Sequence, residues 1–251
     1  MRACLALRDS CRQLCLLSLL CSSIAVFAAE SSAIESMIAQ PGASADLASF
    51  PAGSAHQLIA ATTDDLIALI HSSADYISED EARFYRELDG LLRPLIDFRA
   101  FARAVMGRHA SGKKMAGLAA GERAQLDRQV DRFSEVFSTA LIHTYGKGLL
   151  AFEGQTIDVV PPASSDSART KAQVRQLIYG DRPEPYEIYY SLRKDQRGQW
   201  KLRNLIVESI NLGKVYRNQF DNAYHVYQGD IDQVIDTWSA APATNDGEIS
   251  E

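Results

Sequence analysis

Two pairs of residues have the Ser-x-x-Lys spacing in which a lysine can activate a serine nucleophile. They are Ser111 with Lys114 and Ser191 with Lys194. Neither pair is accompanied by the Ser-Asp-Asn or Lys-Thr-Gly elements of enzymes that use this spacing, and the sequence has no Gly-x-Ser-x-Gly elbow, glycine-rich phosphate loop or His-Glu-x-x-His motif. We therefore assign no catalytic residue and expect a protein that is not an enzyme.

Metal-ligand spacing is also missing. No two of the five histidines combine such a spacing with a nearby carboxylate; they are His56, His71, His109, His143 and His225. All four cysteines fall in the first 28 residues, at positions 4, 11, 15 and 21. We therefore expect no metal site and no cofactor.

The first 28 residues have the pattern of a secretory signal peptide. Arg2, Arg8 and Arg12 give a positive start, and an apolar run from Leu14 to Ala28 follows. The run is shorter than the about 20 apolar residues of a membrane-spanning helix and contains serines, so an uncleaved anchor is the weaker alternative. We expect cleavage after Ala28, which also removes every cysteine and so excludes disulfides from the mature chain.

Charge argues against two classes of partner. The chain carries 26 basic and 32 acidic residues, a net charge of −6. Because the signal takes three arginines and one aspartate with it, the mature chain carries −8. An acidic protein of this kind is a poor ligand for nucleic acid or for an anionic membrane surface, since both depend on Lys and Arg.

Residues 29–60 are rich in Ala and Ser and are expected to form a flexible leader, residues 61–240 one domain, and residues 241–251 a disordered tail. Helical spacing of apolar residues begins at Thr62 and continues, with breaks, to Tyr145, where Gly146 and Gly148 are expected to end the longest helix. A period of two then predicts four strands, at 149–160, 171–179, 186–194 and 199–208. Asn211 and Asp230 are expected to cap two final helices.

This order predicts an α+β domain with a curved, antiparallel four-stranded sheet covered by helices. In the third strand Tyr186, Ile188 and Tyr190 share one face, and Ile206 is expected to continue it in the fourth strand. The many large apolar residues on these elements fit either a filled core or a site for an apolar ligand, and composition does not separate the two.

Three blocks of the chain resemble the MlaC family of periplasmic phospholipid-carrying proteins. They are LIDFRAFARAVMG at 95–107, ALIHTYGKGLLAFEGQ at 140–155, and YEIYYSLRKDQRGQWKLRNLIVESINLGKVYRNQF at 186–220. The resemblance spans about residues 62–240. The chain departs from the family pattern at Arg108–Ala110, where an aromatic pair is usual, at Asn204, where Asp is frequent, and in its longer leader.

The resemblance implies a monomeric periplasmic carrier. It would move a glycerophospholipid between an outer-membrane lipoprotein complex and an inner-membrane ABC transporter complex, holding the acyl chains in an apolar pocket between sheet and helices. The residues expected to line that pocket are Val105, Met106, Phe133, Phe137, Tyr145, Tyr186, Ile188, Tyr190, Leu202, Ile206, Val215 and Phe220. Three cations are weaker candidates for contact with the head group: Lys194, Arg197 and Arg217.

Two other functions stay open on the sequence. One is an adaptor that docks envelope proteins and has no ligand cavity. The other is a lipid hydrolase, which would need an acid, base or nucleophile assembled by tertiary contacts.

Overall fold

The computed structural model describes residues 50–162, 169–180 and 182–239. The expected signal peptide, most of the expected leader and the expected tail lie outside these residues. Within them, no helix combines the length and apolar character needed to cross a membrane.

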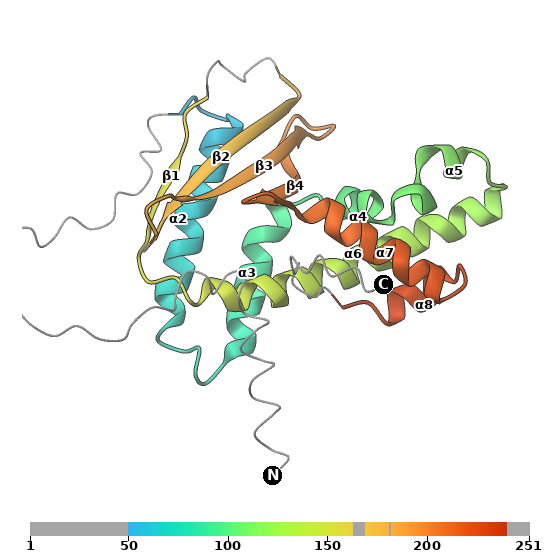
Figure 1. The fold of residues 1–251 in the computed structure, drawn as a ribbon, viewed down its shortest axis with the longest axis horizontal. Helices are drawn as coiled ribbons and strands as arrows, with labels where there is room; N and C mark the ends of the chain where they lie inside the picture. Colours follow the sequence, from blue (N-terminus) through green and yellow to red (C-terminus); the bar gives the residue numbers. More distant parts are fainter. Residues whose placement is uncertain (1–49, 163–168, 181, 240–251) are drawn as a thin grey trace, which may run out of the picture.

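Two groups of helices flank a sheet in chain order (Figure 1). The helices before the sheet are α2 (Ala55–Ser73), α3 (Glu81–Leu95), α4 (Phe98–Met106), the 3-10 turn η3 (Gly107–Ala110), α5 (Gly112–Ala116) and α6 (Ala120–Leu149). The strands are β1 (Thr156–Val159), β2 (Lys171–Tyr179), β3 (Tyr186–Lys194), β4 (Trp200–Val207) and the short β5 (Ile210–Asn211). Helices α7 (Leu212–Val226) and α8 (Ile231–Asp236) follow. The expected α+β class is confirmed.

Side-chain caps explain several helix starts. Asn211 and Asp230 accept hydrogen bonds from the first-turn amides of α7 and α8, as their sequence positions predict. Ser54 caps α2 in the same way, so this helix begins inside the expected leader and seven residues before Thr62. The early start has a packing reason, because Ala55, Ile59 and Ala60 are buried.

The long helix α6 continues through Gly146 and ends at Leu149, so the expected stop at this glycine is wrong. Gly146 is buried, and a Cβ placed on it would lie 2.7 Å from Leu88 Cδ2 of α3. The glycine therefore allows α3 and α6 to approach closely. After α6 the chain turns, with the Ala151 and Phe152 amides donating to Gly148 O and Leu149 O, so the first strand is confined to 156–159 instead of the expected 149–160.

The strands form one antiparallel meander in the order β1-β2-β3-β4-β5. Between β3 and β4 the pairing shifts at Ser191/Leu192, which leaves Arg203 as an extra residue in β4. Leu202 therefore pairs with Leu192, but Leu205 pairs with Tyr190 and Val207 with Ile188. Since cross-strand partners share a face, the bulge brings Leu205 and Val207 onto the face that Leu202 occupies.

Two apolar clusters hold the molecule together. We call the first the helical core; its largest fully buried members, contributed by α3, α6 and α7, are Phe84, Phe133, Phe137, Tyr216 and Phe220. We call the second the sheet core; it joins α2 to the sheet through Ile59, Ala60, Val174, Leu192, Trp200 and Leu202. Figure 1 shows the sheet lying over α2 at one end of the molecule, while α6 runs from beneath the sheet to the helices at the other end.

Candidate functional site

The face of the sheet that packs on α2, which we call the inner face, changes in burial along its strands. At one end Val174, Leu192 and Leu202 are buried in the sheet core. At the other end the side chains are only partly buried, and they are Ile157, Ile178, Tyr186, Ile188, Leu205 and Val207. We call these six residues the inner-face patch.

Helix α2 repeats this change. Its first turns are buried through Ala55, Ile59 and Ala60, whereas Leu66 and Ile70 are partly buried. These positions follow the three-four spacing of one helical stripe, so the stripe begins buried and ends partly exposed. The sheet and α2 therefore leave apolar side chains incompletely covered at corresponding ends.

A series of buried hydrogen bonds lies where the inner face changes from fully buried to partly buried. Gln176 is 2% exposed, its Oε1 accepts from the Tyr190 hydroxyl at 2.7 Å, and its Nε2 donates to Thr63 Oγ1 of α2 at 2.8 Å. Thr63 in turn donates to Ile59 O at 2.9 Å. Burial raises the pKa of Tyr190, so this hydroxyl stays protonated and keeps its donor role.

Five of the expected lining residues lie away from this patch. They are buried in the helical core: Val105, Met106, Phe133, Phe137 and Phe220. Phe137 meets Phe101 and Tyr216 edge-on at ring distances of 5.2 and 5.3 Å, and Phe133 meets Phe220 at 5.0 Å. These aromatic rings pack tightly against one another, as in an ordinary protein interior.

The remaining lining candidates divide between the two cores. Tyr145 and Val215 are partly buried and pack against the helical core, where the Tyr145 and Tyr216 hydroxyls are 2.8 Å apart. Burial raises the pKa of both phenols. On the sheet, Tyr190 and Leu202 belong to the sheet core or pack on it, while Tyr186 and Ile188 lie in the inner-face patch.

Ile206 lies on neither core's side of the sheet, and the prediction that it shares the inner face with Tyr186 and Ile188 is wrong. It pairs with Tyr189 on the outer face of the sheet, because the bulge at Arg203 reverses the alternation after Leu202. Leu205 and Val207 take the inner positions instead. A single extra residue in a strand leaves the apolar pattern of this segment nearly unchanged, so the bulge has no clear signal in the sequence.

The three candidate head-group cations do not meet at the patch. Lys194 and Arg197 lie at the β3–β4 turn, where Lys194 Nζ is 5.0 Å from the centre of the Trp200 ring. Because β3 rises about 3.3 Å per residue, this turn is roughly 26 Å from Tyr186. Arg217 lies on α7, and its Nε donates to Ala104 O of α4 at 2.8 Å.

A different cation lies beside the patch. The Arg182 guanidinium stacks over the Tyr186 ring, 3.4 Å from its centre, and pairs with Glu208 at 2.9 Å. Glu208 has a φ of 58°, a left-handed conformation that is rare for a residue with a side chain. Its Oε1 also accepts from the Glu187 amide at 2.7 Å, so the carboxylate holds the β2–β3 connection against the end of β4.

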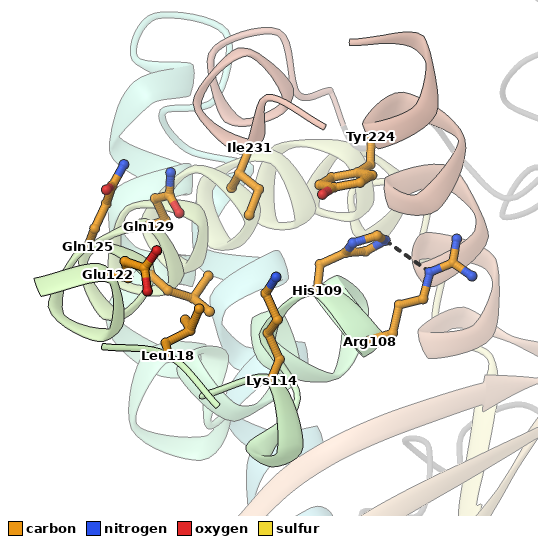
Figure 2. Close-up of a pocket in the computed structure, with 10 residues that line it drawn as sticks. Arg108, His109, Lys114, Leu118, Glu122, Gln125, Gln129, Tyr224 and Ile231 are labelled. Atoms are coloured by element: carbon orange, nitrogen blue, oxygen red, sulfur yellow. Dashed lines mark hydrogen bonds between the residues drawn. The ribbon is translucent and has the colours of Figure 1, made fainter. Parts of the chain in front are cut away.

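Two hollows lie among the helices. The first, of about 420 Å³, includes His109, Lys114, Glu122 and Tyr224 (Figure 2). Figure 2 shows the His109 ring against that of Tyr224. The two ring centres are 3.7 Å apart. The second, of about 540 Å³, lies between α4 and α7. In the described part of the chain, no three His, Cys, Asp or Glu residues gather as metal ligands.

Comparison with known proteins agrees with this fold. A solved structure of a phospholipid-binding protein from Ralstonia solanacearum, in complex with a phospholipid, aligns with a TM-score of 0.59 at 21% identity and covers 73% of this chain and 93% of that one. The toluene tolerance protein ttg2D of Pseudomonas putida is 30% identical over 202 residues, which cover 78% of this chain and 87% of the relative. The MlaC protein family model matches residues 60–240. The chain therefore belongs to the MlaC family.

Proposed function

We propose that this protein is a phospholipid carrier that holds acyl chains against the inner-face patch and α2. The family match and the phospholipid complex of a protein with the same fold support this assignment. The observation in the molecule itself that carries it is the change in burial along the inner face. One end of the sheet is closed by α2, and the other presents a band of incompletely covered apolar side chains.

The energetics favour this surface over the helical core. Each methylene removed from water contributes about 0.8 kcal/mol, so a two-chain lipid gains most by covering apolar groups that are still exposed. The patch offers such groups, whereas Phe133 and Phe137 are already fully buried against protein. In this proposal Tyr186, Ile188, Leu205 and Val207 contact the acyl chains, with Leu66 and Ile70 opposite. The helical core packs against Leu205 and Val207 and so supports this part of the patch.

The proposed role requires no bond to be broken, so the protein acts as a carrier and not as an enzyme. We propose that it works in the periplasm after loss of its signal peptide. There it would exchange lipid with an inner-membrane ABC transporter complex and an outer-membrane lipoprotein complex. The toluene tolerance name of the Pseudomonas putida relative is in keeping with a role in maintaining the cell envelope.

The first test is native mass spectrometry of the protein purified from membrane-containing cells, followed by lipid extraction. We expect an added mass that matches a phospholipid. Two variants that differ in the face they change make the test specific: Ile188→Asp on the inner face and Ile206→Asp on the outer face of the neighbouring strand. Both isoleucines are partly buried, so a general loss of packing affects the two alike.

The carrier proposal expects Ile188→Asp to lose the lipid and Ile206→Asp to retain it. Equal retention by both variants would exclude the inner face as the binding surface. A wild-type protein that is free of lipid and takes none from liposomes would favour the adaptor. Release of fatty acid or head group from phospholipid during incubation would favour the hydrolase.

A further inference from the structure

Three arginines line the 540 Å³ hollow between α4, η3 and α7. Arg103 comes from α4, Arg108 from η3 and Arg217 from α7. The carboxylate in the lining is Asp221, so the charged side chains around the hollow carry a net charge of about +2 at neutral pH. This local excess stands in a chain whose overall charge is −6.

Asp221 is already fully engaged. It pairs with Arg108 at 2.8 Å, and its Oδ1 lies 2.8 Å from His109 Nε2. Because a carboxylate only accepts, this ring nitrogen carries the proton and donates. The His109 hydrogen bond, with a smaller contribution from the Arg108 charge, lowers the pKa of Asp221. The carboxylate therefore stays charged and neutralises Arg108 alone among the three guanidinium groups.

Arg103 and Arg217 have no carboxylate within ion-pair distance in the part of the chain that the structure describes. Each is held by a backbone carbonyl instead. Arg103 Nη2 donates to Ala110 O at 3.3 Å, and Arg217 Nε donates to Ala104 O at 2.8 Å. A guanidinium has five N–H donors, so each keeps donors for a further partner.

The backbone is shaped to hold Arg217 in this place. Gly107 follows α4 with a φ of 56°, and a Cβ added to it would lie 3.2 Å from Arg217 Cδ. The stem of Arg217 therefore lies across the end of α4, where any other residue at 107 would crowd it. This contact fixes the guanidinium beside the hollow before any ligand arrives, which lowers the entropy cost of binding.

We propose that this hollow is a binding site for a phosphate group, contacted by Arg103 and Arg217 and flanked by Arg108. Planar guanidinium groups match the oxygens of a phosphate, and paired arginines are a common way to bind it. The site is separate from the inner-face patch, because it lies between helices α4 and α7 (Figure 1), whereas the patch lies on the sheet and shares no residue with it. The phosphate group can belong to a small organophosphate or to the head group of a lipid in a membrane.

The test uses the full mature chain and isothermal titration calorimetry with inorganic phosphate and with glycerol 3-phosphate. Arg103→Gln and Arg217→Gln are each expected to weaken binding by at least about tenfold, since a charge-assisted hydrogen bond is lost. Arg197→Gln, in the β3–β4 turn, removes an exposed arginine elsewhere and is expected to leave binding unchanged. Arg217→Lys, which keeps the charge, is expected to bind better than Arg217→Gln.

Flotation with vesicles distinguishes the two sources of phosphate. Binding to phosphatidylglycerol vesicles but not to phosphatidylcholine vesicles, lost in Arg217→Gln, would identify a lipid head group. Saturable binding of glycerol 3-phosphate without flotation would identify a small ligand. The proposal is overturned if no probe binds, or if the Arg103 and Arg217 variants bind as the Arg197 variant does. Retention of copurified phospholipid is expected to be the same in all variants, so this outcome is independent of the carrier proposal.

Discussion

The helical core and the sheet core differ in how completely they are closed. In the helical core the largest side chains are fully buried and their aromatic rings pack edge-on against one another. Along the inner face of the sheet, burial is complete near Val174 and Leu192, in the sheet core, and becomes partial towards Tyr186 and Val207, in the inner-face patch. The helical core thus supplies stability without a ligand, while the sheet region has apolar surface that a ligand can complete.

The largest expected effect is in the closed region. Phe137→Ala removes a ring that contacts Phe101, Phe133, Tyr216 and Trp238. We expect a loss of about 3–5 kcal/mol in the free energy of unfolding, because these neighbours cannot all move into the space. Denaturant unfolding of lipid-free protein measures it. Ile188→Ala in the inner-face patch is expected to cost much less, and an equal cost would remove the distinction between the regions.

Two helical glycines have opposite surroundings, one crowded and one open. Gly146→Ala places a methyl group 2.7 Å from Leu88 Cδ2, and overpacking of this kind costs about 1–3 kcal/mol. Gly90→Ala in α3 meets no atom within 4 Å. There the gain in helix propensity is expected to stabilise the protein by about 0.5–1 kcal/mol. Thermal unfolding midpoints that move in the same direction would contradict the close contact of α3 and α6.

The buried hydrogen bonds of Gln176 on the inner face are expected to have a smaller effect on the free energy of unfolding. Tyr190→Phe removes the donor to Gln176 Oε1 and leaves that buried oxygen without it. We expect a loss of about 1–2 kcal/mol. Tyr189→Phe is the matched control, because its hydroxyl donates to Glu187 on the outer face, where water can replace it. If the two variants have the same urea midpoint, Gln176 has another donor available.

The smallest effect concerns pH. The His109 hydrogen bond and the Arg108 charge lower the pKa of Asp221 in the folded protein. A carboxylate with a lowered folded pKa adds stability above its unfolded pKa of about 3.9, and this stability is lost as the pH falls through the folded value. Asp221→Asn is therefore expected to be less stable than the wild type at pH 7, with the difference vanishing in acid.

Glu187→Gln is the corresponding change on the sheet, where Arg175 and Tyr189 lower the pKa of the glutamate. It is expected to show the same pH dependence. Stability measured by urea unfolding from pH 7 down to pH 2 checks both. A difference from wild type that persists unchanged in acid would mean that the aspartate or glutamate acts by packing and not by charge.

The sequence predicts the parts of this fold that depend on local rules. The α+β class, the meander, and the caps at Asn211 and Asp230 follow from periodicity and capping chemistry. The end of α6 does not follow from the sequence, because Gly146 has the residue type of a helix stop, while its role is set by contact with Leu88 of α3. Only tertiary structure distinguishes these uses of glycine.

The candidate site shows the same limit. Tyr186 and Ile188 are placed on the inner face by simple alternation, but the bulge at Arg203 moves Ile206 off it and brings in Leu205 and Val207. The sequence places both Phe133 and Tyr186 on apolar faces and cannot tell them apart. In the structure Phe133 is fully buried in the helical core, whereas Tyr186 is only partly buried. The three head-group candidates do not converge, because Lys194 and Arg197 lie at the β3–β4 turn, far along the sheet from the patch, and Arg217 lies on α7, where it is held by Ala104 O of α4.

The bulge in β4 has a consequence for how the molecule unfolds. Trp200 and Leu202 before it belong to the sheet core, while Leu205 and Val207 after it pack against the helical core. Strand β4 therefore contributes side chains to both cores, and Leu92 and Ile96 contact both cores as well. Neither core can be lost while the other keeps its full set of contacts. The protein is therefore expected to melt in a single cooperative transition, as one folding unit.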